Sequence, residues 1–379
     1  MDNKRPLFKD AGRNLLKQKT KMKEIRLKIF IIIILLPLLS FSQPKNVILM
    51  IGDGMGLAHA YAAYTVNRGQ LNMFDMPVTG FSKTYSADKY ITDSGAGGTA
   101  MATGQKANNE SIGLDSLWLP HPSLMTLAKK KGLSTGIVVT CDITHATPAS
   151  FYANVKHRKM DQEIALALLD ENVDIFIGGG LKNFLAKNRK DGLSLTDSLE
   201  KRGYKLVYNL DELSLLKRNK DKKENHVAGL LYDGHPPLAS KRDDMLSKSL
   251  EKSLELLSAN KKGFFMMVEG SQIDFEAHLN RFDNMVEEVL DFDKAVGLAI
   301  EFAKRDKNTL VIIIADHETG GLTLNGGSIE EGKVKDKWSS FNHTAIMVPI
   351  YAFGLGAENF TGVMENTDVF KKISSLLDL

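Results

Sequence analysis

The chain has 379 residues, of which 43% are hydrophobic and 25% charged, a composition typical of globular proteins rather than of disordered or fibrous ones. Its net charge of +3 is unevenly spread: residues 1–42 hold ten Lys or Arg and three acids, a net +7, so the rest of the chain carries −4. A mildly acidic body gives no support to nucleic acid as a specific partner.

The N-terminal segment has the order of parts found in a secretory signal peptide. Basic residues precede an apolar run of ten residues at Phe30–Leu39, and the small-residue sequence Ser40-Phe41-Ser42 follows it. A start at Met22 would give a signal of typical length, so we interpret residues 1–42 as an extension and signal peptide. The body is then exported, to the periplasm or outside the cell. The alternative is an uncleaved anchor, which would be the chain's only membrane contact.

Along the body, short apolar runs without polar alternation predict strands buried on both faces. They are Asn46–Ile51, Thr135–Thr140, Asp174–Ile177, Lys205–Tyr208, Phe264–Val268, Thr309–Ala315 and Ile346–Phe353. Helices are predicted between them, at Ser123–Lys131, Met160–Glu171, Asp243–Ala259, Asp283–Arg305 and Thr367–Leu377. This alternation predicts an α/β fold over a single domain, 43–379: a doubly wound, mostly parallel central sheet with helices on both faces.

Three of the predicted strands lead directly into acids, namely Asp53, Glu269 and Asp316. Ligands in open α/β sheets bind beyond the carboxyl ends of the strands, so these acids are expected to meet at one edge. Clustered carboxylates without basic partners are unfavourable when buried, unless cations neutralise them. The sequence therefore predicts a metal site.

Histidines add nitrogen ligands to this set. Asp274 and His278 are spaced i, i+4 and would share one face of a helix. Together with Asp316-His317 they make a set of nitrogen and oxygen ligands that suits zinc. His343, just before the last long predicted strand, is weak evidence alone, because a single histidine is more often structural.

The candidate nucleophile is Ser94, which opens a segment rich in Gly and Ala at 95–100. Small residues let a helix begin close to a ligand, and the free N–H groups of a helix N-terminus favour phosphate oxygens. The alternative is that Ser94 only caps the helix. The segment is neither a Walker loop nor a Gly-x-Ser-x-Gly elbow. Cys141, the single cysteine, is interpreted as a small buried residue rather than a nucleophile.

Six segments, in order along the chain, resemble the motifs of the alkaline phosphatase family. They are Asn46–Gly56 (NVILMIGDGMG), Thr92–Gly104 (TDSGAGGTAMATG), Thr144–Ala149 (THATPA), Val268–Asp274 (VEGSQID), Ala315–Gly320 (ADHETG) and His343-Thr344. Chance agreement of six motifs in order is remote.

The resemblance implies two Zn²⁺ and a third metal, usually Mg²⁺. The residues that match the ligands of the first zinc are Asp274, His278 and His343. Those that match the ligands of the second are Asp53, Asp316 and His317. Those that match the third site are Asp53, Thr147 and Glu269. His145 stands where some members have a carboxylate beside the third metal, which leaves Zn²⁺ or Co²⁺ open there.

The resemblance also assigns the chemistry. Ser94 matches the phosphorylated nucleophile, Asp93 is a candidate orienting residue, and Arg158 matches the phosphate-binding arginine, although local sequence alone favours a surface position in its basic run. Phe275 stands where some members carry a basic residue near the phosphate. The implied activity is hydrolysis of small phosphate monoesters, with broad specificity suited to phosphate scavenging.

Several alternatives and assembly features remain open. A phosphodiesterase of the same superfamily would use the same metals, and a non-catalytic metal- or phosphate-binding protein would keep the ligands without the chemistry. No Cys/Ser-x-Pro-x-Arg context supports a sulfatase. The short interval from His317 to His343 predicts a small or absent accessory (crown) insertion, and a homodimer is an assembly common in the family. The remaining histidines are expected to be structural or on the surface: His59, His121, His157, His226 and His235.

Overall fold

A computed structural model describes residue 13 and residues 17–26, 43–217 and 226–379. The chain divides into two compact units, Met1–Ser42 and Gln43–Leu379. Residues 17–26 of the first unit are helical. The apolar run and the cut predicted for a signal peptide lie outside the described residues. No helix among those described has the length and apolar character needed to cross a bilayer.

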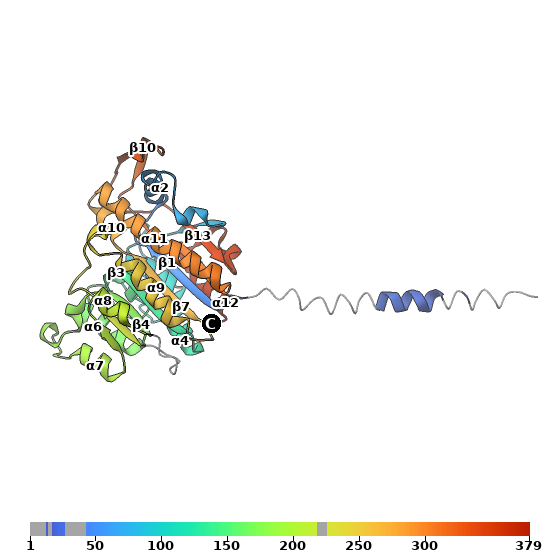
Figure 1. The fold of residues 1–379 in the computed structure, drawn as a ribbon, viewed down its shortest axis with the longest axis horizontal. Helices are drawn as coiled ribbons and strands as arrows, with labels where there is room; N and C mark the ends of the chain where they lie inside the picture. Colours follow the sequence, from blue (N-terminus) through green and yellow to red (C-terminus); the bar gives the residue numbers. More distant parts are fainter. Residues whose placement is uncertain (1–12, 14–16, 27–42, 218–225) are drawn as a thin grey trace, which may run out of the picture. The chain divides into compact units, whose positions relative to one another are not determined.

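The second unit is built on a ten-stranded sheet with the order β14-β2-β13-β8-β1-β7-β3-β4-β6-β5 (Figure 1). The strands are β1 (Asn46–Gly52), β2 (Val78–Lys83), β3 (Ser134–Asp142), β4 (Ile175–Gly179), β5 (Lys205–Val207), β6 (Val227–Leu230), β7 (Phe264–Gly270), β8 (Thr309–Ile314), β13 (Val348–Gly354) and β14 (Gly362–Glu365). Only β13 runs antiparallel to its neighbours in this sheet. The sheet is therefore mostly parallel, as predicted.

Two groups of helices cover the sheet, as expected for a doubly wound fold. The helices are α2 (Leu57–Val66), α3 (Ser94–Thr103), α4 (Leu124–Lys131), α5 (Ala146–Ala149), α6 (Asp161–Glu171), α7 (Leu195–Lys201), α8 (Leu210–Leu215), α9 (Met245–Leu257), α10 (Gln272–His278), α11 (Phe282–Asp306) and α12 (Asn366–Leu377). In one group α2 and α9 pack on α11, and α9 and α11 lie side by side over central strands (Figure 1). In the other, α3, α4 and α12 pack on one another.

The register of the central strands brings their carboxyl ends together. Ile51 of β1 pairs with Glu269 of β7 on one side and with Ile314 of β8 on the other. These strands are apolar and buried on both faces. A shift in register would disturb the packing of buried side chains along the whole strand and is therefore unfavourable. Asp53 and Asp316, which follow β1 and β8, therefore reach the same edge of the sheet as Glu269.

The insertion between His317 and His343 is small, as the short interval predicts. It holds the hairpin of β10 (Thr323–Ser328) and β11 (Lys333–Lys337), which contacts α2. At its ends, β9 (Glu318–Thr319) pairs with β12 (His343–Thr344).

All seven predicted strands and all five predicted helices are present, with bounds that differ by a few residues. The last predicted strand begins at Val348, because Ile346 and Met347 before it are exposed. Three strands of the sheet were not predicted, because their patterns are short or contain polar residues: β2, its neighbour β14 at the edge, and the four-residue β6.

Candidate active site

Ser94 is the first residue of α3 and is buried. Asp93 caps the helix, since its carboxylate accepts a hydrogen bond from the Ala96 N–H at 3.0 Å. Small residues are needed on this helix because it lies against the end of β8: a Cβ added at Gly97 would come within 3.1 Å of Asp316. The helix thereby sets the serine hydroxyl beside the carboxyl ends of the central strands.

The nearest cluster to Ser94 consists of Asp53, Asp316 and His317. The Ser94 Oγ lies 3.2 Å from His317 Nε2. The same nitrogen lies 3.4 Å from Asp53 Oδ1 and 3.3 Å from Asp316 Oδ2. All three residues are buried, and one ligand atom from each lies within 4.8 Å of the others. This is a donor set of the kind that binds zinc.

The charges of this cluster are not balanced by the described residues. Both carboxylate oxygens of Asp53 and the Oδ2 of Asp316 are buried, and none of them has a hydrogen-bond partner there. Burial, followed by repulsion from Asp316, raises the pKa of Asp53 well above its usual range. Burial and repulsion from Asp274 raise the pKa of Asp316 to about 6. Such a site is stable in its ionised form only with a cation, so the residues fit a bound metal.

A second cluster is formed by Asp274 and His278 of α10 and His343 of β12. The two Nε2 atoms lie 3.0 Å apart, and Asp274 Oδ1 lies 3.4 Å from His278 Nε2 and 3.6 Å from His343 Nε2. The other ring nitrogens face backbone carbonyls, His278 Nδ1 at 2.6 Å from Phe341 O and His343 Nδ1 at 2.9 Å from Thr92 O. Donation from Nδ1 leaves both Nε2 lone pairs free for a metal.

The two clusters adjoin. The rings of His317 and His343 stack with centroids 3.5 Å apart. The Thr319 hydroxyl donates to Asp274 Oδ1 at 2.5 Å and lies 3.2 Å from His317 Nδ1. Burial, followed by the neighbouring His343 and His278, lowers the pKa of His317 well below its usual value, so its ring is neutral and able to bind a metal.

A third cluster holds Cys141, His145 and Glu269, with ligand atoms again within 4.8 Å of one another. Thr147 Oγ1, Glu269 Oε1 and His145 Nδ1 are buried, and no described residue forms a hydrogen bond with any of them. Burial and repulsion from Asp316 raise the pKa of Glu269 to about 8. Thr147 belongs with them because its side chain interacts with that of Glu269, so the predicted residues Thr147, Glu269 and His145 lie in one place and the structure adds Cys141 to them.

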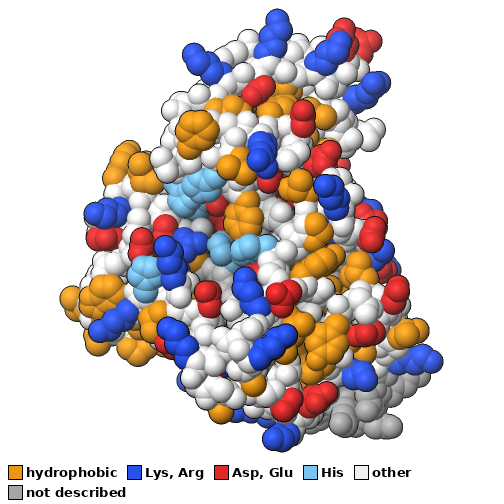
Figure 2. All heavy atoms as spheres, turned by 90° about the vertical axis from the view of Figure 1, so that its left-hand side faces the viewer, with side chains coloured by type: hydrophobic (Ala, Val, Ile, Leu, Met, Phe, Trp, Pro, Cys, Tyr) orange, Lys and Arg blue, Asp and Glu red, His pale blue; other side chains and the backbone are white. Residues whose placement is uncertain are grey.

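Arg158 points into the site and not away from it, although local sequence alone favoured a surface position. Its Nη1 donates to Asp93 Oδ2 at 2.8 Å, and its Nη2 lies 3.3 Å from His145 Nε2. The guanidinium therefore lies between the helix that carries Ser94 and the third cluster. Figure 2 shows histidine side chains gathered around a hollow on this face of the molecule, with acidic side chains inside it.

Among the remaining histidines, His235 lies beside the site. Its ring centroid is 5.8 Å from that of His145 and 5.1 Å from that of Phe275, and its Nδ1 accepts a hydrogen bond from the Asp142 N–H at 2.9 Å. No local sequence signal marks this histidine, because it lies on an irregular loop between Leu230 and Met245. His59, by contrast, is buried against Trp338, as expected of a structural residue.

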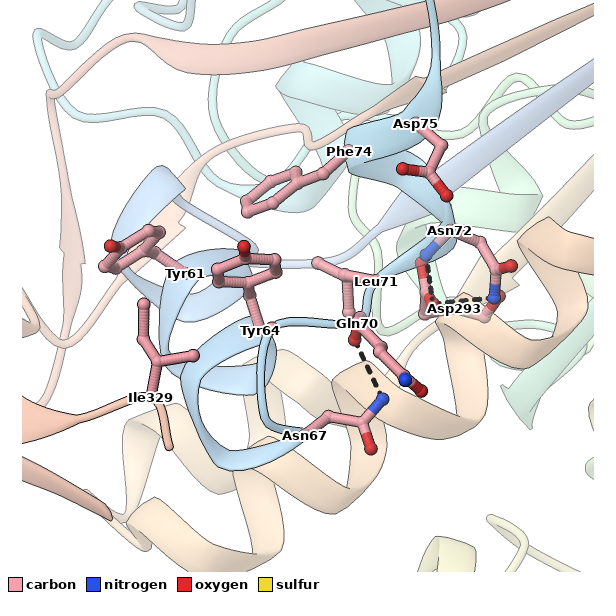
Figure 3. A pocket seen from close by; sticks show the side chains of 11 residues that line it. Tyr61, Tyr64, Asn67, Gln70, Leu71, Asn72, Phe74, Asp75, Asp293 and Ile329 are labelled. Carbon is pink, nitrogen blue, oxygen red and sulfur yellow. Dashed lines mark hydrogen bonds between the residues drawn. The ribbon is translucent and has the colours of Figure 1, made fainter. Parts of the chain in front are cut away.

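A separate pocket of 690 Å³ lies between α2 and the segment that follows it. Its lining residues are Tyr61, Tyr64, Asn67, Gly69, Gln70, Leu71, Asn72, Phe74, Asp75, Asp293 and Ile329. Polar groups in it bond to one another: Asn67 donates to the Gln70 carbonyl and Asn72 to Asp293 (Figure 3). None of its residues belongs to the three clusters, so it is not part of the candidate site.

Comparison with known proteins gives the same family from sequence and from structure. A model of the alkaline phosphatase family matches residues 44–335. Alkaline phosphatase 4 of Bacillus subtilis is 37% identical, with 89% of each chain covered. The alkaline phosphatase of Escherichia coli is 32% identical over 90% of this chain and 88% of its own.

Solved structures of the alkaline phosphatase from the Antarctic bacterium TAB5 superpose with a TM-score of 0.82. One of them is 34% identical and covers 89% of this chain and 99% of its own. Another, 35% identical with the same coverage, is a histidine-to-aspartate variant with Mg bound in the site called M3. The family match, these relatives and the buried clusters of metal-binding residues agree, and the chain belongs to the alkaline phosphatase family of metal-dependent phosphoric monoester hydrolases.

Proposed function

We propose that this chain hydrolyses phosphate monoesters through a phosphoserine at Ser94. The observation that carries the proposal is the position of the Ser94 hydroxyl, 3.2 Å from His317 Nε2, in a buried set of carboxylates and imidazoles. A serine alcohol is a weak nucleophile near neutral pH and needs such an environment to react.

The two main clusters would each hold one Zn²⁺. Asp274, His278 and His343 would bind the first, and the residues for the second would be Asp53, Asp316 and His317. When bound, these ions supply positive charge that lowers the pKa of the serine hydroxyl and of water, and that stabilises the departing oxygen.

The chain's own residues hold the reacting groups in place. The N-terminus of α3 offers free N–H groups to phosphoryl oxygens, and the Arg158 guanidinium can contact two of them. Asp93 would orient this arginine through their 2.8 Å contact. Phosphoryl transfer depends mainly on such positioning and on charge stabilisation.

The reaction would proceed in two displacements. The Ser94 hydroxyl gives up its proton and its Oγ forms a bond to phosphorus while the bond from phosphorus to the ester oxygen breaks, and the alcohol leaves after taking up a proton. A water oxygen then forms a bond to phosphorus, the bond to Oγ breaks, and inorganic phosphate departs as Ser94 regains its proton.

The third cluster would hold a third metal, with Asp53, Thr147 and Glu269 as oxygen donors. Mg²⁺ prefers oxygen ligands, whereas the imidazole of His145 favours Zn²⁺ or Co²⁺. The TAB5 variant, which carries aspartate in place of a histidine and has Mg in its M3 site, supports this reasoning.

The physiological setting belongs to the same proposal. The basic and apolar order of residues 1–42 supports export, and a broad range of small phosphomonoesters would then be hydrolysed outside the cytoplasm for phosphate scavenging. Tight selectivity for one substrate would contradict this part.

The test is hydrolysis of p-nitrophenyl phosphate by the purified chain with zinc and magnesium at alkaline pH. Turnover should collapse in Ser94→Ala and in a chelated sample, and bis-p-nitrophenyl phosphate and a sulfate ester should be poor substrates. A folded, zinc-loaded protein that leaves the monoester intact would overturn the proposal. Faster hydrolysis of the diester than of the monoester would indicate a phosphodiesterase. Inactivity on all three esters would indicate a non-catalytic binding protein.

A further inference from the structure

The third cluster contains one donor that the family motifs do not include. Cys141 is fully buried, and its Sγ lies 3.7 Å from Glu269 Oε2 and 3.2 Å from the Asp142 carbonyl oxygen. We infer that Cys141 contributes its sulfur as a ligand at the third metal site, and that this site therefore selects Zn²⁺ or Co²⁺ over Mg²⁺. The inference rests on the proposed function only for the existence of the third site.

The fold places this side chain in the cluster because Cys141 lies near the carboxyl end of β3, next to β7. Val139 of β3 pairs with Glu269 of the neighbouring β7. Cys141 lies two residues further along β3, and the 3.7 Å contact of its Sγ with Glu269 Oε2 shows that this side chain faces the Glu269 carboxylate. The pairing of β3 with β4 is irregular between Val138 and Asp142, at the point where the strand turns toward His145.

Unpartnered groups mark the space between these residues as a ligand site. Glu269 and Thr147 are fully buried and their side chains interact with each other, yet neither Glu269 Oε1 nor Thr147 Oγ1 has a described partner at good hydrogen-bond geometry. The Nδ1 of His145 is also buried and has no hydrogen-bond partner among the described residues. Buried polar atoms are rarely left without partners, so a cation that accepts sulfur, nitrogen and oxygen donors accounts for all of them at once.

The donor atoms of the third cluster determine which cation the site prefers. Thiolate and imidazole are soft or intermediate ligands that suit Zn²⁺ and Co²⁺, whereas Mg²⁺ takes oxygen ligands in an octahedral arrangement. Binding would release the thiol proton to solvent as the metal–sulfur bond forms. The rival role for Cys141 is a thiol that only donates a hydrogen bond to Glu269 and so positions it.

Cobalt substitution separates these two roles, because Co²⁺ bound to a thiolate shows a sulfur-to-metal charge-transfer band in the near ultraviolet. Cys141 is the only cysteine in 379 residues, so such a band has a single assignment. The full chain, purified, stripped of metal and titrated with Co²⁺, should develop the band as the third equivalent binds. A chain that binds three Co²⁺ without this band, or that binds only two, would overturn the inference.

Two variants complete the test. Cys141→Ser should lose the band and lower Zn²⁺ affinity at the third site by about tenfold or more, while Mg²⁺ affinity holds or rises. A band that persists in Cys141→Ser contradicts the inference. Ser94→Ala is the matched control: it should keep the band while it loses turnover. A parent that shows the band but hydrolyses no ester would contradict the proposed function and leave the sulfur ligand standing.

Discussion

Arg158 has a position in the candidate site that its neighbours in the sequence do not indicate. It lies in the basic run 156–159, yet it is turned inward by Asp93 and lies beside His145. An arginine fixed by a carboxylate keeps its planar fork in one orientation, and this orientation is what a tetrahedral phosphoryl group requires.

Arg158→Ala should therefore weaken phosphate binding more than it slows chemistry. A charged hydrogen bond to phosphate contributes about 1.5–3 kcal/mol, so KM and the inhibition constant for inorganic phosphate should rise by about tenfold to a hundredfold. Steady-state kinetics on p-nitrophenyl phosphate measure both. Lys159→Ala, at an exposed neighbouring position, is the control and should change neither. Equal effects of the two substitutions would mean that only the charge of the basic run matters.

The residues that sequence reasoning missed have no local chemical signal. Cys141 follows an apolar run and is indistinguishable from a packing residue until the register of β3 and β7 places it beside Glu269. His235 reaches His145 only through the path of an irregular loop. The motif residues could be predicted because six short segments carry them together, whereas these two depend on tertiary structure alone.

At the scale of elements, α3 combines a structural cap with a functional contact. One carboxylate oxygen of Asp93 accepts the Ala96 N–H and the other accepts from Arg158. The start of the helix, and with it Ser94, is therefore fixed by the same side chain that orients the arginine.

Substitutions at Asp93 should separate its role as the cap of α3 from its role in orienting Arg158. Asn is as good a helix cap as Asp, so Asp93→Asn should keep thermal stability while it raises KM through a less well oriented Arg158. Asp93→Ala should lose the cap as well, at a cost of about 1 kcal/mol in the free energy of unfolding. Denaturant unfolding and steady-state kinetics test the pair. Asn and Ala variants of equal stability would show that the cap contributes nothing.

The central strands were predictable because they are apolar on both faces, as parallel strands covered by helices must be. The strand β2 was missed because polar and small residues interrupt its sequence VTGFSK, as is typical near the edge of a sheet. The hairpin β10–β11 was missed because its residues are mostly exposed, so no burial pattern marks it.

At the scale of the whole molecule, the sheet places buried acids where folding alone would not favour them. A carboxyl whose pKa is higher in the folded chain than in the unfolded one binds more protons when folded, so stability falls as pH rises between the two values. For Asp316 this window runs from 3.8 to about 6, and for Glu269 from 4.5 to about 8. Metal binding opposes this loss of stability at higher pH, because carboxylate and imidazole ligands bind metal better when they are deprotonated.

The buried histidines with lowered pKa, such as His59 and His317, oppose this trend only below the ordinary histidine pKa of 6.5. The metal-free chain should therefore melt at a lower temperature at about pH 8 than at about pH 7, and added zinc should raise the melting temperature more at the higher pH. Thermal unfolding followed by circular dichroism, with chelator and with zinc, measures both effects. Zinc stabilisation of the same size at both pH values would show that the buried carboxyls do not couple folding to metal binding.

The most direct test of the account as a whole is to trap the covalent intermediate. The zinc-loaded chain is mixed with p-nitrophenyl phosphate or inorganic phosphate, quenched in acid and digested, and the peptide that contains Ser94 is examined by mass spectrometry. One added phosphoryl group is expected on Ser94 and should be absent from Ser94→Ala, whose turnover should fall by at least about a thousandfold. Undiminished turnover by Ser94→Ala, or trapped phosphate on another residue, would contradict the proposed mechanism.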